Sequence, residues 1–201
     1  MPELVNNTPN QESLISLPID GHTGASLRNL VNLLYSRAPL LSKATGGFFE
    51  VKKSLIESLI AKGTPNTTEA FRNFLEDNKG YGVLYGVQIL EDKIDFPGFG
   101  KELDAEHAKA YMELAARLNQ MALKQKRILA KDVNSENEKY AMHIFLIRLG
   151  MNGPNFQQER KILMERLSGS QAFRTPDQME RAKIKNAQKR KMMRQQGAKM
   201  E

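Results

Sequence analysis

One long apolar run constrains the fold of this chain more than any other feature. It extends from Tyr140 to Leu149 and contains only two charged or ionisable side chains besides the tyrosine. A helix that is apolar on nearly every side is normally buried. Ser135 stands three residues before Glu138, which is the spacing of a capping box at a helix start. The pattern therefore predicts a buried helix over residues 137–149.

The residues after this run predict a helical hairpin. Gly150 suits the position just after a helix, and Asn152-Gly153-Pro154 is a turn sequence. Asn155 can cap a second helix whose apolar residues follow one stripe. We expect Gly169 to end that second helix. The two helices would form a hairpin, and its first helix would be the core of the domain.

Apolar periodicity also predicts further helices and a small β region. Helical spacing marks four other segments, at 23–38, 54–62, 66–78 and 104–131. Pro39 is expected to interrupt the first of these. Alternation at 48–51 and 81–96 predicts strands. The expected fold class is α+β and mostly α-helical, with about five to seven helices around the buried central helix and its hairpin. A small antiparallel β-hairpin or sheet and a basic C-terminal helix complete it.

The positive charge is concentrated at the C-terminus. The 201 residues have a formal net charge of +7, and residues 174–201 hold nine Lys or Arg against three Asp or Glu. The pI of about 9.5 is therefore a property of this tail and not of the body. We expect a loose N-terminal segment over 1–16, a compact α-rich domain over 17–173, and a helical or disordered basic tail over 174–201.

Composition restricts the cellular setting. The chain has no cysteine, which excludes disulfides and thiolate metal sites and is compatible with the cytoplasm. No stretch approaches the roughly 18 apolar residues of a membrane span, and the first residues lack the pattern of a secretory signal. A cytoplasmic protein without a membrane partner is expected.

Basic runs bind the nucleic-acid backbone through release of counterions, which makes the tail a candidate nucleic-acid site. The candidate residues in the tail are Arg174, Arg181, Lys183, Lys185, Lys189, Arg190, Lys191 and Arg194. A second basic patch lies at the end of the long helix, at Lys124, Lys126, Arg127 and Lys131. A solvated tail that only keeps the protein soluble is an equally open alternative. The tail has no aromatic residue, so base stacking is not expected from it.

A glycine-flanked turn before the first helix is a weaker candidate, for an anion. Free N–H groups at a helix start favour negative charge, and the site would comprise Gly21, His22, Thr23, Gly24 and Arg28. The turn is not a P-loop, because no Lys-Ser or Lys-Thr follows the second glycine. A tight turn that caps the helix is the structural alternative.

Nothing in the sequence predicts a catalytic centre, a metal site or a cofactor. His22, His107 and His143 have no zinc-like spacing, and His143 is expected to be buried and hydrogen-bonded. Ser168 lacks the glycine pattern of a nucleophile elbow. Arg148 is expected to form a buried salt bridge or carbonyl contact, with phosphate or carboxylate binding as the alternative. A role other than catalysis is favoured, and an enzymatic function is the less favoured alternative.

Several blocks in one order resemble a family of small proteins described as "virulence-related protein", carried on conjugative and integrative elements of Firmicutes-type bacteria. The blocks are Gly21–Gly24 with Leu27–Asn32, Ala110–Ala115, Asn137–Tyr140, Leu146–Gly150, and Leu167–Gly169 with Ala172–Arg174. The resemblance covers about Leu17 to Lys191. It implies a mobile-element setting and brings no established activity or catalytic residue.

These observations lead to two functional hypotheses. The first is a mobile-element accessory protein that binds nucleic acid, DNA in preference to RNA, through its basic C-terminal helix. The alternative is a protein-binding module or an inhibitor that acts on a host defence protein. The nearly neutral body would not serve as an acidic mimic of DNA.

Overall fold

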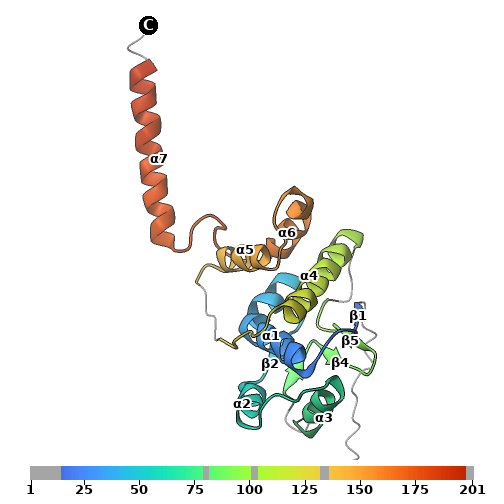
Figure 1. Cartoon of the computed structure of the whole chain (residues 1–201). Coiled ribbons are helices and arrows are strands. Elements are labelled where there is room, and N and C mark those ends of the chain that lie inside the picture. Colours follow the sequence, from blue (N-terminus) through green and yellow to red (C-terminus); the bar gives the residue numbers. More distant parts are fainter. Residues whose placement is uncertain (1–14, 79–81, 101–103, 132–135, 198–201) are drawn as a thin grey trace, which may run out of the picture. The chain divides into compact units, whose positions relative to one another are not determined.

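The computed structural model describes residues 15–78, 82–100, 104–131 and 136–197, without the side chains of Pro176 and 194–197. The expectations for residues 1–14 and for Ser135 lie outside these ranges. The chain is mostly helical with short antiparallel strands, which confirms the α+β, mostly α-helical class (Figure 1). It forms two compact units, 1–133 and 134–201, so the boundary between them lies within the 17–173 segment.

Unit 1 combines helices with two small sheets. Its helices are α1 (Gly24–Thr45), α2 (Lys53–Ala61), α3 (Thr68–Asn78) and α4 (Ala105–Lys124). Its strands are β1 (Ser16–Pro18), β2 (Glu50–Val51), β3 (Leu84–Tyr85), β4 (Gln88–Ile89) and β5 (Lys93–Asp95). Unit 2 holds α5 (Glu138–Arg148), the 3-10 turn η2 (Pro154–Phe156), α6 (Gln157–Met164) and α7 (Pro176–Gly197).

Helix α1 forms the centre of unit 1. Leu27, Leu30 and Leu41 are fully buried along it, and α1 packs on α4, α3, α2 and β2. The expected interruption at Pro39 is wrong, because α1 continues through this residue to Thr45. Proline removes one backbone donor from a helix, and burial of the apolar side chains before and after it compensates for that loss.

The larger sheet has the strand order β1-β5-β4, and both pairings are antiparallel. The expected hairpin is formed by β4 and β5, whose turn carries a backbone hydrogen bond from Leu90 N to Lys93 O. Strand β1 was not expected from the sequence. It aligns Ser16 with Asp95, and the Ser16 hydroxyl donates to the Asp95 carboxylate at 2.5 Å. The smaller sheet pairs β2 with β3.

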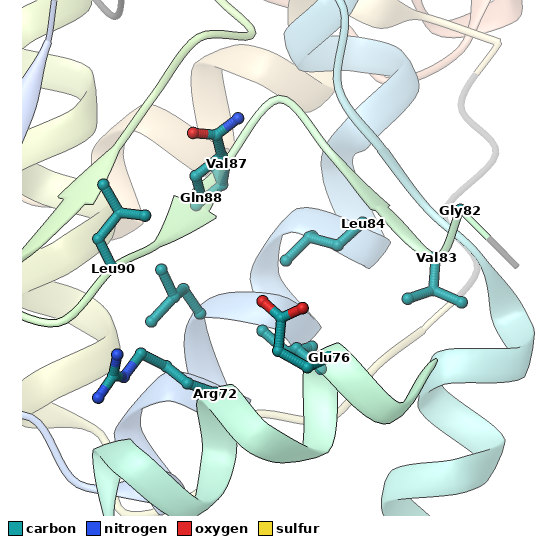
Figure 2. A pocket seen from close by; sticks show the side chains of 10 residues that line it. Arg72, Glu76, Gly82, Val83, Leu84, Val87, Gln88 and Leu90 are labelled. Carbon is teal, nitrogen blue, oxygen red and sulfur yellow. The ribbon is translucent and has the colours of Figure 1, made fainter. Parts of the chain in front are cut away.

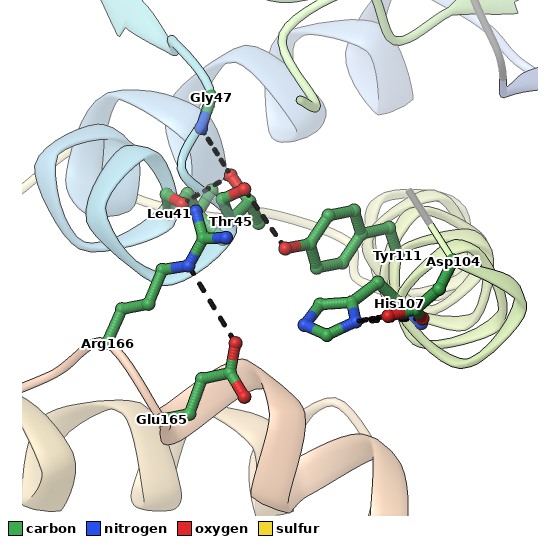
Figure 3. A network of polar contacts seen from close by, with 8 residues as sticks. All are labelled: Leu41, Thr45, Gly47, Asp104, His107, Tyr111, Glu165 and Arg166. Atoms are coloured by element: carbon green, nitrogen blue, oxygen red, sulfur yellow. Dashed lines mark hydrogen bonds and ion pairs between the residues drawn. The ribbon is translucent and has the colours of Figure 1, made fainter. Parts of the chain in front are cut away.

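Helix α4 is attached to the end of α1 by a buried tyrosine. Tyr111 is fully buried, and its hydroxyl donates to the carbonyl oxygen of Thr45 at 3.0 Å (Figure 3). The Thr45 hydroxyl in turn donates to Leu41 O and accepts from Gly47 N. This network closes the last turn of α1 and fixes the side of α4 that faces it.

Helix α4 begins where expected but ends earlier. Asp104 caps it by accepting a hydrogen bond from the His107 amide at 2.8 Å, and the His107 ring also lies 2.9 Å from the same carboxylate. The helix ends at Lys124, so the expectation of a helix to about Lys131 is wrong. The chain from Gln125 onwards is extended instead, because polar side chains of α1 bind its backbone.

Helix α5 begins at a cap formed by Asn137, whose side chain accepts from the Tyr140 amide. At its other end, Gly150 adopts φ +83°, while Gly150 N and Met151 N donate to Ile147 O and Leu146 O. These two bonds form a Schellman motif, which confirms Gly150 as the residue that ends the helix.

The expectation that this helix is buried on every side is wrong. Its buried residues are Met142, Phe145 and Leu146, whereas Ile147 is 41% exposed. The helix therefore buries one face, and α5 belongs to unit 2 and not to the core around α1. Apolar composition alone does not reveal how much neighbouring structure is available to cover a helix.

Gly169 has positive φ but does not end a helix. Its φ is +96°, while α6 ends five residues earlier at Met164. A Cβ atom at Gly169 would lie 2.3 Å from the side-chain oxygen of Asn137. The same Asn137 side chain donates to the carbonyl oxygens of Ser170 and Phe173. Glycine is needed here because the loop before α7 folds around this asparagine.

Candidate nucleic-acid interface

The basic tail is helical over almost its whole length. The Thr175 hydroxyl accepts from Gln178 N at 3.3 Å, and the Gln178 side chain accepts from Arg174 N. Proline at the first helical position suits this start, because its missing N–H would have no partner there. The expected helix from 176 to about 196 is therefore confirmed, although the side chain of Arg194 lies outside the described residues.

The cations of α7 encircle the helix. Arg181, Lys185 and Lys189 are four residues apart and follow one row along the surface. Arg190 is nine residues from Arg181, which at 3.6 residues per turn places it on about the opposite side. Described side chains of these basic residues are exposed, and so are the apolar Ile184 (52%) and Met192 (64%). Helix α7 thus has no neutral stripe that could pack on a protein core.

A second basic surface is built into unit 1, and its backbone is held by α1. The Asn29 amide donates to Gln125 O at 2.6 Å, and its oxygen accepts from Ile128 N at 2.9 Å. Asn32 donates to Ile128 O at 2.8 Å, and Lys131 N donates to the Ser36 hydroxyl. Asn29 is only 1% exposed, so its own bonds are largely shielded from water, whereas the bond from Lys131 N to Ser36 is exposed. They hold residues 125–131 along α1 without any sheet or helix.

This segment and the last residue of α4 carry the basic strip, which we define as Lys124, Lys126, Arg127 and Lys131. All four side chains are exposed. Within the part of the chain that the structure describes, none of the four forms an ion pair. Their backbone is ordered while their charges are not neutralised, so the basic strip is available to an anionic partner without a large ordering cost.

The glycine-flanked turn is closed by its own hydrogen bonds. Thr23 and Ser26 form a reciprocal capping box, and Gly24 N donates to Asn66 O at 3.0 Å. A Cβ at Gly24 would lie 1.7 Å from the Pro65 carbonyl oxygen, so the turn is also covered. Arg28 is directed to Thr64 and Asn29 and not to the turn. Because these N–H groups already have acceptors, the geometry favours the structural alternative of a helix cap.

His22 connects this turn to α4. Its Nε2 lies 2.7 Å from the Asn119 side-chain oxygen, an acceptor, so this nitrogen carries the proton of the neutral ring. Its Nδ1 lies 2.9 Å from the Ser26 hydroxyl. Burial lowers the pKa of the His22 imidazole, and the hydrogen bond to Asn119 opposes this shift only in part. The neutral ring therefore serves as a structural link.

The remaining candidate side chains, Arg148, His143 and Ser168, belong to unit 2. Arg148 is exposed, so the expected buried contact is wrong; the helix face that carries it is open to solvent. His143 is only half-buried, and its shielded Nδ1 has no hydrogen-bond partner among the described residues. Ser168 donates to the Glu138 carboxylate at 2.7 Å. Over the described ranges, no group of three or more His, Asp or Glu side chains could hold a metal ion.

The structure also identifies functional supports that the sequence did not predict. Asn29 and Asn32 shape the basic strip, and Asn137 organises the loop before α7. Their common signal is an asparagine within or beside a strongly apolar segment. A side-chain amide that is buried there needs hydrogen-bond partners. The partners lie far away in the sequence: Asn29 and Ile128 are 99 residues apart, and His22 and Asn119 are 97 residues apart.

No family model, curated protein or solved structure matches this chain. No helix in the described ranges is long and apolar enough to cross a bilayer.

Proposed function

We propose that this protein binds duplex nucleic acid without catalysing a reaction, as an accessory protein of a mobile genetic element that acts in the cytoplasm. The observation that supports the proposal best is the charge arrangement of α7. Six of its described residues, from Arg181 to Lys191, are exposed cations, and among these six only the Lys183 ammonium forms an ion pair, with Glu180 at 3.5 Å. Such a helix neutralises phosphates and releases counterions.

The distribution of these cations favours a groove in DNA. A helix with cations on opposite sides suits a site that has phosphates on both sides. The DNA major groove, about 12 Å wide, admits an α-helix, whereas the major groove of A-form RNA is too narrow. The 22 residues of α7 would extend roughly 33 Å, which is enough to pass several phosphates. We therefore propose duplex DNA in preference to RNA as the partner.

The basic strip supplies a second set of contacts in this proposal. Its four cations belong to a backbone fixed by Asn29 and Asn32, so they suit a single phosphate backbone and not a groove. Neither surface presents an evident reader of base edges. Contacts to phosphate fix position but carry no sequence information, so binding is proposed to be largely independent of sequence.

A salt titration of the full chain tests the proposal. With four to six phosphate contacts, log K on a random duplex should fall against log salt with a slope of roughly −3.5 to −5.5. The variant Arg181→Gln/Lys185→Gln/Lys189→Gln should make this slope shallower by roughly 2 to 3. The matched control, Lys52→Gln/Lys53→Gln/Lys62→Gln, changes the charge equally on exposed positions of unit 1 and should keep the original slope.

Two results would contradict the proposal. No binding at low salt by any of the proteins would leave α7 as a solubility tail. An equal decrease for both triple variants would show that only net charge matters, and that α7 is not the contact surface.

A second candidate function is the binding of a host protein. It is favoured by an exposed aromatic pair, Phe48 (57% exposed) and Tyr85 (40%), whose rings meet edge to face at 5.8 Å. Aromatic residues are enriched at protein interfaces. In that case one protein should co-purify in stoichiometric amount after nuclease treatment, and Phe48→Ala/Tyr85→Ala should remove it.

A further inference from the structure

Unit 1 and unit 2 each contain a cavity, and the two differ in their lining. The cavity of unit 1, of about 320 Å³, lies beside Arg72, between α3 and the chain from Gly82 to Leu90, and its wall is mostly aliphatic (Figure 2). The cavity of unit 2, of about 500 Å³, lies where α6 meets the start of α5, and we call it the α5–α6 groove. Six of its seven lining residues are charged or carry an amide, so it suits a charged ligand. None of them belongs to α7 or to the basic strip.

Hydrogen bonds hold the backbone on one side of the α5–α6 groove. Lys139 N donates to Ser168 O at 3.0 Å, and the Asn137 amide donates to Ser170 O at 2.8 Å. These two bonds attach the loop after α6 to the first turn of α5. Lys139 and Gln171, which line the groove, therefore come from segments that are tied to each other.

Three cations line the groove. The Arg160 guanidinium is positioned by Nη1, which donates to Met151 O at 2.8 Å and to Gly153 O at 2.9 Å, and its other nitrogens carry further donors. Lys139 is half-buried and Lys161 is exposed. Over the described part of the chain, neither of these two ammonium groups forms an ion pair. Both are therefore open to an anion.

The charge of the lining favours an anion with more than one negative charge. Three cations and one anion, Glu165, leave a net charge of +2. The Glu165 carboxylate lies 3.8 Å from Nε of Arg166, which reduces its repulsion of a bound anion. A phosphate monoester carries about −1.5 to −2 at pH 7, whereas each diester within a nucleic-acid strand carries a single negative charge. The lining thus matches a monoester better than a diester.

We propose that the α5–α6 groove binds a phosphate monoester. The phosphate oxygens accept from Lys139, Arg160 and Lys161, and the amides of Gln157 and Gln171 supply further donors. No aromatic side chain lines the groove, so nothing there stacks on a base, and recognition is limited to the phosphate. The monoester is supplied by the end of a nucleic-acid strand or by a free small molecule.

Two small probes test the assignment on the full chain without DNA. Methyl phosphate is a monoester, and dimethyl phosphate is a diester with the same phosphorus centre. In an NMR titration, methyl phosphate should bind about tenfold more tightly than dimethyl phosphate, because it carries the additional charge. The side-chain amide signals of Gln157 and Gln171 should shift, which locates the probe in the groove.

A pair of double variants separates the groove from net charge. Lys139→Gln/Lys161→Gln should weaken methyl phosphate binding by about tenfold or more, because it removes two charge-assisted contacts. The matched control, Lys53→Gln/Lys62→Gln, removes two exposed lysines of unit 1 and should leave this binding unchanged. The dispersion of the amide signals verifies that each variant is folded.

A comparison of two short duplexes distinguishes the sources of the monoester. They have the same sequence, with a 5′-phosphate or a 5′-hydroxyl on each strand. If the source is a strand end, the wild type should bind the phosphorylated duplex several-fold more tightly, and Lys139→Gln/Lys161→Gln should lose this preference. If the source is a free small molecule, the wild type should bind both duplexes equally and still bind methyl phosphate.

Three results would overturn the assignment: no effect of methyl phosphate at about 20 mM on the Gln157 and Gln171 signals, a concentration above the weak dissociation constants of very small ligands; binding of dimethyl phosphate as tight as that of methyl phosphate; or methyl phosphate binding that Lys139→Gln/Lys161→Gln does not weaken. The probes require no duplex, and the salt slope of α7 requires no groove, so this proposal and the proposed DNA binding fail separately.

Discussion

The side-chain nitrogen of Asn29 lies 2.6 Å from the carbonyl oxygen of Gln125, a residue 96 positions later in the chain. This contact turns the segment after α4 away from helical geometry and along α1. It determines where Lys126 and Arg127 emerge. One buried amide on the central helix thus controls the placement of a charged surface that lies mostly outside any helix or strand.

Replacing Asn29 by leucine should be strongly destabilising. The variant keeps the volume but leaves the partly buried Gln125 O and Ile128 N without their partner, at up to about 1–3 kcal/mol for each group. Urea denaturation gives the change in free energy of unfolding. Amide exchange of Ile128 should accelerate more than that of residues in α2, and equal acceleration would mean that the contact only supports global stability.

Replacing Tyr111 by phenylalanine should cost about 1–2 kcal/mol. The change removes only the hydroxyl that donates to Thr45 O at 3.0 Å, within a fully buried site. Thermal or urea denaturation measures the effect. Tyr85→Phe is the control, because that ring is 40% exposed and should change the stability little. Similar stability for wild type and Tyr111→Phe would exclude this bond as a contributor.

Replacing Gly150 by alanine should cost about 1 kcal/mol or more. Its φ of +83° lies in the left-handed region, which disfavours residues with a Cβ atom. The comparison is Gly169→Ala, which should cost more, because it adds a collision with the Asn137 side chain to the same backbone strain. A Gly150→Ala variant with an unchanged melting temperature would contradict the strain argument.

Below a pH of about 6.5, His22 should make the free energy of unfolding decrease as the pH falls. Burial lowers the pKa of its imidazole in the folded chain, so the unfolded chain binds a proton first as the pH falls. Unfolding then takes up this proton, and the free energy of unfolding decreases between the unfolded and the folded pKa. Above this window both states are neutral at His22, and it contributes no pH dependence.

The variant His22→Gln tests this linkage. Its free energy of unfolding should depend less on pH than that of the wild type over pH values from about 7.5 down to 5. A constant difference between the two proteins over this range would mean that the folded and unfolded chains bind this proton equally.

The starts of α1, α4 and α7 could be predicted because their signals are local. Thr23 with Ser26, Asp104 and Thr175 each cap a helix within four residues of their own position. The ends were predicted less well. The early end of α4 depends on Asn29 and the continuation of α1 through Pro39 depends on burial, and neither is visible in the local sequence.

The pairing of β1 and the burial of α5 could not be predicted for a related reason. Strand β1 has three residues, and its partner β5 lies over 70 residues away. The composition of α5 indicates an apolar helix but not how many faces are covered. Candidate cations were visible in the sequence as a charge run, whereas the cavity beside Arg72 exists only once α3 and residues 82–90 come together.

The hydrogen bonds from Asn137 to the loop before α7 have a consequence for avidity. Asn137 donates to Phe173 O, and Arg174 directly follows, so the first cation of the tail starts from an anchored point. In the proposed DNA complex, once one of these cations binds a phosphate, the others are confined to a sphere with a radius of roughly 33 Å, the length of α7. Their effective concentration near the next phosphates is then in the millimolar range that short tethers provide. Loosening this anchor by Asn137→Ala would reduce retention on long DNA more than on a short duplex that offers only one contact at a time.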